Sequence, residues 1–140
     1  MQKKIMVRHT HRYTNERAIL FEGIAMCEDF DTYREYRYIE KAGTKVVMYC
    51  YEDHIQIERF GMIHSCLNLY ENRTTKNPME SVYGIFDIEM TTFAYRREDR
   101  YVMVEYDVES GTEEKDGFII ELEEVINEYN WESLKGSNQR

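Results

Sequence analysis

The stretch YVMVEYDV at residues 101–108 alternates apolar and polar side chains with a period of two. Such alternation places successive side chains on opposite faces of a β-strand, so that one face is buried and the other meets solvent. The same pattern recurs in FDIEMT at residues 86–91 and along most of the chain. The repetition predicts an all-β protein whose sheet has to enclose its own core.

Segments of this kind follow one another without helical crossovers. The polar stretch 71–79, which contains the only proline, is expected to be a loop. Residues 17–27 contain good helix formers, so their pattern leaves helix and strand open. Strands in series with short turns pair antiparallel, and closure removes their exposed edges. We therefore predict a single up-and-down barrel over residues 1–126. The expected strands are at 3–13, 17–27, 33–40, 45–52, 54–60, 62–70, 81–93, 101–109 and 118–126.

Size and charge describe one ordinary globular domain. The chain has 140 residues, of which 42% are hydrophobic and 32% charged, enough to bury a core without disulfides or metals. Its formal net charge of −9 would repel phosphate backbones, so we expect no nucleic-acid partner. The sequence has neither a signal-peptide core nor an apolar run long enough for a membrane span. We predict a cytoplasmic protein.

Cysteine and histidine spacing suggests no metal site. Cys27, Cys50 and Cys66 are widely spaced in apolar segments, which predicts reduced core thiols. His9 and His11 lie two apart and share one face of a strand. Two ligands are only a fragment of a zinc site, so we expect no metal and no other cofactor.

The catalytic alternatives are weak, and we expect no enzyme. His64 and Cys66 share a strand face, but a catalytic thiol needs an electropositive setting, and the surrounding residues are apolar or acidic. Asp87 and Glu89 lie on the polar face of their strand, where nothing raises a carboxyl pKa for acid–base work.

Several short motifs, taken in their order and spacing, carry a resemblance to a known family. They are RFG at 59–61, YGIF at 83–86, TT at 91–92 and VEYDV at 104–108, within a similarity from about 5 to 126. With these motifs the chain resembles the small bacterial family called domain of unknown function 1934, or the YwiB-like family, which is placed among the calycins with the lipocalins and fatty-acid-binding proteins. The resemblance implies an antiparallel calycin barrel of about eight strands, with residues 17–27 as a strand, and it supplies no activity.

Arg59 is the first candidate for a binding residue. It shares a strand face with Ile55 and Ile57, so we expect it to point into the barrel. A guanidinium there needs an anion, and a ligand carboxylate or phosphate would serve. Glu124 shares its face with Leu122 on the last strand, so an internal ion pair between Arg59 and Glu124 is the alternative.

Three tyrosines are further candidates. Tyr106, Tyr36 and Tyr38 lie in expected strands whose residues alternate in polarity, and their hydroxyl groups could bind a ligand. The alternative is packing, because amphipathic rings suit half-buried strand positions.

The C-terminal segment changes period. Residues 122–129 repeat at three and four, which predicts a short helix, and we expect the tail 127–140 to be partly helical or disordered. Trp131, the only tryptophan, would plug one end of the barrel or contact another protein.

Three functional hypotheses follow. The first is a barrel that binds a small amphipathic or anionic ligand in its interior. The second is a protein-interaction or structural module with a filled barrel, including a homodimer. An enzyme is the third, and a cavity holding a perturbed carboxylate, histidine or cysteine would favour it.

Overall fold

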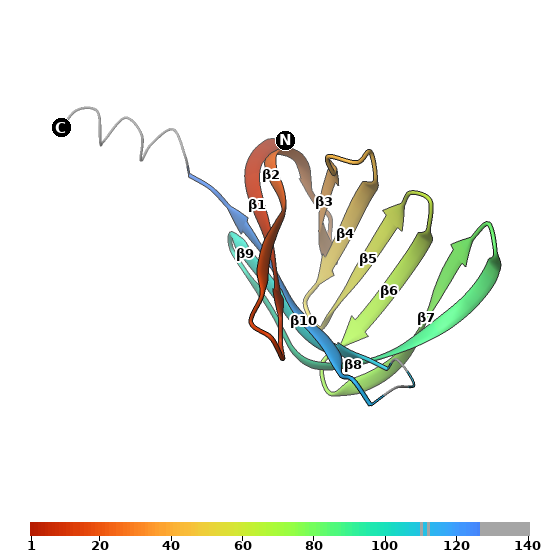
Figure 1. The fold of residues 1–140 in the computed structure, drawn as a ribbon. Helices are drawn as coiled ribbons and strands as arrows, with labels where there is room; N and C mark the ends of the chain where they lie inside the picture. Colours follow the sequence, from red (N-terminus) through yellow and green to blue (C-terminus); the bar gives the residue numbers. More distant parts are fainter. Residues whose placement is uncertain (110, 112, 127–140) are drawn as a thin grey trace.

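The computed structural model of the protein describes residues 1–109, 111 and 113–126. The strands in these residues form one closed antiparallel barrel, in which each strand pairs with its neighbours in sequence and β10 closes on β1 (Figure 1). The prediction of a single up-and-down barrel is confirmed, with ten strands rather than about eight. They are β1 (Gln2–His11), β2 (Arg17–Asp29), β3 (Tyr33–Ile39), β4 (Lys45–Tyr51), β5 (His54–Phe60), β6 (His64–Tyr70), β7 (Arg73–Ser81), β8 (Gly84–Glu98), β9 (Tyr101–Val108) and β10 (Asp116–Glu124).

The additional strand is β7, and the prediction of a loop at this place is wrong. β7 pairs with β8 along its whole length, but with β6 only at His64–Ser65 against Met79–Glu80. Pro78 has no N–H to donate to a ladder. Beyond the short ladder, the side chain of the buried Asn77 accepts a hydrogen bond from the Asn68 N–H at 2.7 Å. A side-chain amide thus replaces a backbone partner, which period-two patterning does not reveal.

A second interruption lies between β2 and β3. The two strands pair only at Met26–Asp29 against Arg34–Arg37. Residues 17–25 of β2 therefore pair with β1 alone and diverge from residues 38–39 of β3. We call this gap in the pairing the β2–β3 seam.

The core fills the barrel interior. Every strand except β7 contributes buried apolar side chains to it, and β7 contributes the buried Asn77 and the partly buried Met79. Inward and outward residues alternate as expected for a half-buried strand. The buried apolar residues of this cluster are Ile5, Val7, Ala25, Cys27, Tyr36, Tyr38, Val46, Met48, Cys50, Ile55, Ile57, Leu67, Leu69, Met90, Tyr95, Val102, Val104, Tyr106 and Leu122.

The meander places alternate turns at the same end of the barrel. We call one end the mouth and the other the base. Turns 12–16, 40–44, 61–63 and 82–83 surround the mouth, and turns 30–32, 52–53, 71–72 and 99–100 surround the base. In Figure 1 the hairpin of β7 and β8 extends away from the rest of the barrel at the mouth.

Two expectations concern helices. In the described part of the chain, no helix is long and apolar enough to cross a bilayer. The expected C-terminal helix and Trp131 lie outside the described residues.

Candidate functional site

The candidate residues separate into two groups inside the barrel. Tyr36 and Glu124 lie together toward the base, where the tyrosine hydroxyl donates to Glu124 Oε2 at 2.6 Å. Lys3 Nζ is 3.4 Å from the other oxygen of the same carboxylate. Burial, followed by the bond to Glu124, raises the pKa of Tyr36 above its usual range. The Glu124 carboxylate therefore has a partner at each of its two oxygens.

Arg59 lies toward the mouth and does not pair with Glu124. Its Nη1 and Nη2 donate to Glu40 Oε2 and Oε1 at 3.0 and 2.5 Å. The interpretation of an internal Arg59–Glu124 pair is therefore wrong. Glu40 follows the end of β3 in the 40–44 turn, where strand alternation no longer predicts the direction of a side chain. The ion pair is bidentate and partly shielded, with the Glu40 side chain 12% exposed and that of Arg59 36%.

Tyr38, Tyr106 and His9 lie within electrostatic range of this ion pair. Burial raises the pKa of Tyr106 to about 12, against the opposing effect of the positive Arg59. Burial lowers the pKa of His9, and the charges of His11 and Arg59 lower it further. The positive charge of Arg59 therefore acts in the same direction on Tyr106 and His9, lowering the pKa of both.

Two buried oxygens near this group have no hydrogen-bond partner among the described residues. They are the hydroxyl of Tyr38 and Oγ1 of Thr92, which lies opposite Tyr106 in the β8–β9 ladder. Tyr38 is 4% exposed, and burial raises the pKa of its hydroxyl, followed by the effect of the Glu40 carboxylate. An unpartnered buried oxygen calls for a bound water or a ligand.

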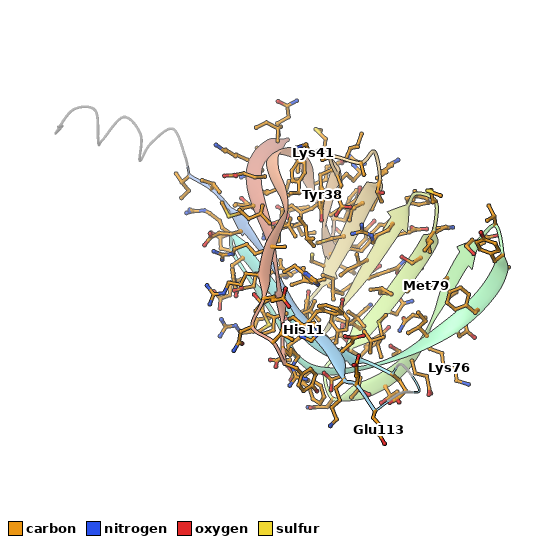
Figure 2. The ribbon with its side chains drawn as sticks, in the orientation of Figure 1. His11, Tyr38, Lys41, Lys76, Met79 and Glu113 are labelled. Carbon is orange, nitrogen blue, oxygen red and sulfur yellow. The ribbon has the colours of Figure 1, made fainter. Side chains whose placement is uncertain are left out.

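The ring of Phe21 borders the β2–β3 seam and packs on Tyr38. The two rings stack with centroids 4.6 Å apart and planes at 29°. Space for the ring of Phe21 comes from Gly23, where a Cβ would come within 3.2 Å of it. In Figure 2, Tyr38 and Lys41 are labelled close to the end of β3, beside this seam.

Two hollows open in the seam on either side of the Phe21 ring. One has a volume of about 370 Å³ and is lined by Ile19, Leu20 and Lys41 among others. The other, of about 280 Å³, is lined by Ala25 and Tyr38 among others. Both border the apolar side chains of Phe21 and Ile39, and the smaller one also borders Tyr38.

A polar hollow of about 510 Å³ lies at the base, lined in part by Lys3, Arg34 and Glu124. Arg34 is already paired, because its Nε donates to Asp29 at 2.8 Å and its Nη1 donates to the Asp99 carbonyl at 2.6 Å. These two contacts connect the turns of the base.

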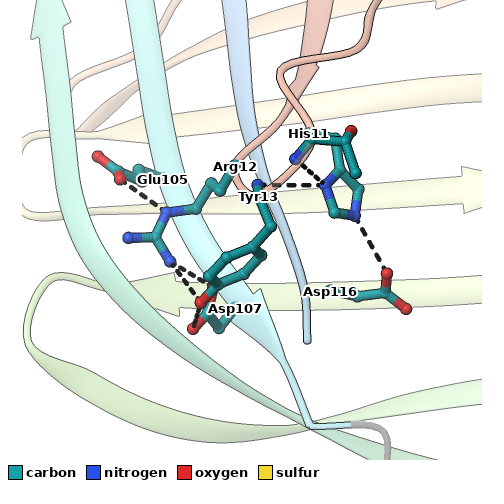
Figure 3. A network of polar contacts seen from close by, with 7 residues as sticks. His11, Arg12, Tyr13, Glu105, Asp107 and Asp116 are labelled. Carbon is teal, nitrogen blue, oxygen red and sulfur yellow. Dashed lines mark hydrogen bonds and ion pairs between the residues drawn. The ribbon is translucent and has the colours of Figure 1, made fainter. Parts of the chain in front are cut away.

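The histidines with catalytic or metal-binding potential have structural partners. His11 Nδ1 accepts hydrogen bonds from the backbone N–H groups of Tyr13 and Thr14, both at 3.2 Å. Its Nε2 therefore carries the proton and donates to Asp116 at 3.1 Å (Figure 3). His9 stacks on Phe118 at 4.4 Å. Among the described residues, no group of three or more His, Cys, Asp or Glu side chains is arranged to hold a metal.

The cysteines are free thiols in apolar surroundings. Cys27 and Cys50 are buried, and Cys66 is half-buried. Burial raises the pKa of the Cys50 thiol to about 12 and also raises the pKa of the other two. His64 pairs with Glu58 at 2.9 Å, while Cys66 contacts the Gln56 amide at 3.3 Å. Each side chain of the formal His64–Cys66 pair thus has another partner.

Sequence reasoning missed Phe21, Glu40 and Thr92. Phe21 follows Leu20, which the β1–β2 ladder skips at its register shift, so strand parity breaks there. Glu40 lies in a turn, and Thr92 precedes a second shift in the ladder. No sequence signal marks Glu40 as the partner of Arg59, Phe21 as the partner of Tyr38 or Thr92 as the neighbour of Tyr106.

Comparison with known proteins shows similarity of fold alone. No protein-family model and no curated protein matches the chain. A solved structure that matches is the crystal structure of the ywiB protein from Bacillus subtilis, with a TM-score of 0.67 over 89% of this chain and 93% of that chain. The two sequences are 12% identical. The chain therefore has a YwiB-like fold.

Proposed function

We propose that this protein is a non-enzymatic binding barrel that takes a small amphipathic molecule through the β2–β3 seam. The polar end of the ligand would contact the Tyr38 hydroxyl, and its apolar part would lie against Phe21 and Ile39. The observation that carries the proposal is the unpartnered Tyr38 oxygen behind an apolar gap in the barrel wall. A buried polar group without a partner destabilises a fold by about 1–3 kcal/mol, which a ligand group would relieve.

The ion pair beside Tyr38 selects the charge of the ligand. Glu40 already occupies two donors of Arg59 in bidentate geometry. A ligand carboxylate would have to displace Glu40 or lie beside it, at an electrostatic penalty. A neutral head that exchanges a hydrogen bond with Tyr38 meets no such penalty, so neutral amphiphiles fit better than the anion first expected at Arg59.

Apolar contact in the seam supplies only modest affinity. Burying about 300 Å² of ligand surface contributes roughly 7 kcal/mol, and association costs at least about 4 of these. The remainder corresponds to millimolar binding. The hydrogen bond to Tyr38 and the rearrangement of Phe21 therefore decide whether binding is measurable.

The neutral fluorescent amphiphile N-phenyl-1-naphthylamine tests the proposal. Tyr38→Phe removes the unpartnered hydroxyl, so it should leave stability unchanged or raise it, and should weaken probe binding about threefold to tenfold. Tyr36→Phe is the matched control on the same strand. It removes the bond to Glu124, so it should lower stability by about 1–2 kcal/mol and leave probe affinity nearly unchanged.

Two results would refute the seam as the site. The first is equal probe affinity of the wild type and Tyr38→Phe. The second is a loss of stability in Tyr38→Phe as large as that in Tyr36→Phe, because the Tyr38 hydroxyl would then have a partner in the free protein.

A protein-binding module with a filled barrel is the second candidate function. The tip of the β7–β8 hairpin exposes Val82, Tyr83 and Ile85 at 87%, 97% and 72%. The exposed acids Glu80 and Asp87 flank this apolar tip. The charge pattern fits a protein partner whose apolar contact is surrounded by lysine or arginine. Loss of such binding in Tyr83→Ser, with unchanged binding of the amphiphile, would assign the role to the hairpin.

We also propose that the chain belongs to the family of domain of unknown function 1934 and shares the calycin architecture. The shared fold with the ywiB protein and the ordered short motifs support this proposal. A sequence at least about 30% identical to both chains over their length would link them. A linking sequence that aligned the motifs out of register would contradict it.

A further inference from the structure

A hollow on the outer face of the barrel lies across β1, β2 and β10, next to the seam and sharing Ile19 with it. Its volume is about 750 Å³, and Arg8, Arg17, Ile19 and Ile119 are among the residues that line it. The strand register places Arg8 opposite Ile19, and it places Thr10 between Arg17 and Ile119. Two cations and two isoleucines therefore face one space outside the core.

Arg8 lines this hollow, and no carboxylate lies within hydrogen-bond distance of its guanidinium among the described residues. Its Nε is buried and has no hydrogen-bond partner among the described residues. The nearest carboxylate contact of its guanidinium is Nη2 to Glu123 Oε1 at 3.9 Å, which exceeds hydrogen-bond distance. Glu121 lies opposite Arg8 in the ladder, but its Oε2 accepts from the Tyr101 hydroxyl at 2.5 Å. Among the described residues, the Arg8 guanidinium thus has no anion at hydrogen-bond distance.

Arg17 supplies the second charge at the edge of the hollow. It is exposed at the start of β2, and within the described residues it forms no ion pair. The neighbouring Arg12 shows the contrast, because Glu105 accepts from its Nε at 2.7 Å and Asp107 accepts from its Nη1 (Figure 3). Two carboxylates neutralise Arg12, whereas the hollow leaves Arg8 and Arg17 available.

We infer that this outer hollow binds a carboxylate with a short apolar body, its head on Arg8 and Arg17 and its chain against Ile19 and Ile119. Arginine presents planar N–H pairs that match a carboxylate. In a chain with a net charge of −9, anions are repelled from most of the surface, so a site that accepts one needs unpaired cations of this kind. The apolar walls favour a fatty or aromatic acid over a small inorganic ion.

Octanoate and 1-octanol are matched probes for this site. Their binding is measured by the changes in backbone amide NMR shifts of the whole chain. Octanoate should shift amides of residues 8–19 and 119–121, and Arg8→Gln should weaken it about tenfold. Arg17→Gln should weaken it by a smaller factor, since that side chain is exposed. Arg73→Gln is the control, because it removes the same charge from the exposed start of β7.

Octanoate affinity that falls equally in Arg8→Gln and Arg73→Gln would overturn the inference, since only net charge would then matter. Equal weakening of 1-octanol and octanoate in Arg8→Gln would also overturn it, as would octanoate shifts centred on residues 38–41. If inorganic phosphate bound as tightly as octanoate, the proposed apolar contacts with Ile19 and Ile119 would be refuted. The seam proposal is tested by Tyr38→Phe with a neutral probe, so the two can fail independently.

Discussion

Replacing Gly117 by alanine should break the network that holds the β1–β2 turn on β9. Gly117 is buried in β10, beneath the Arg12 side chain. A Cβ at this position would lie closer than 3.0 Å to Asp107 Oδ1, and 3.1 Å from both Arg12 Cδ and the Tyr106 carbonyl oxygen. The Tyr106 carbonyl is part of the paired strand β9 and cannot shift away. The Asp107 side chain therefore has to move to make room for the Cβ.

The expected loss of stability follows from the hydrogen bonds that Asp107 accepts. Its Oδ1 accepts from Arg12 Nη1, and its Oδ2 accepts from the Tyr13 hydroxyl at 2.6 Å (Figure 3). Overpacking of this kind costs about 1–3 kcal/mol, and the lost charge-assisted bond adds about 1 after allowance for its partial exposure. Replacing glycine in a strand returns about 0.5–1 kcal/mol. The net loss should be about 1–3 kcal/mol, or about 3–10 °C in Tm.

Urea unfolding of a double-mutant cycle measures this directly. The cycle contains the wild type, Gly117→Ala, Asp107→Ala and the double variant. Since Asp107→Ala removes the clashing oxygen, the alanine at 117 should cost at least about 1 kcal/mol less in that background. Additive effects, or a Gly117→Ala protein within about 0.5 kcal/mol of the wild type, would refute the clash as the reason for glycine.

Three further predictions concern the interior. Glu40→Gln should lower stability by about 1 kcal/mol, and Arg59→Met by about 2, because it leaves the shielded carboxylate unpaired; equal urea midpoints for the three proteins would contradict the pair. Burial raises the pKa of the Cys50 thiol to about 12, so its alkylation should be at least about 100-fold slower in the folded than in the unfolded protein; similar rates would show that the thiol is accessible. Burial also raises the pKa of Tyr106 and Tyr101 to about 12, from the 10.0 of exposed tyrosine. Folding favours their protonated form, so this stability is complete below pH 10 and is lost as the pH rises from 10 to about 12; urea midpoints that do not fall in this window would contradict the shift.

Local periodicity determined much of the architecture. Alternation within 101–108 depends only on the pleat of one strand, so it identified the buried Val102, Val104 and Tyr106 without knowledge of their neighbours. The same parity placed Arg59 and Glu124 inside the barrel. The absence of crossover segments, together with the need to remove open edges, predicted antiparallel closure.

Only the tertiary structure decided which inward side chains meet. Arg59 and Glu124 share the interior but lie toward opposite ends, because the register of the whole barrel sets how far along its axis each residue falls. The strand β7 is held by β8 and by the Asn77 amide, a long-range contact that its polar sequence does not announce. The β2–β3 seam likewise arises where pairing stops, next to a register shift in β2. A period of two predicts on which face of the sheet each side chain lies. Which side chains meet across strands depends on registers and bulges that form only when all the strands assemble.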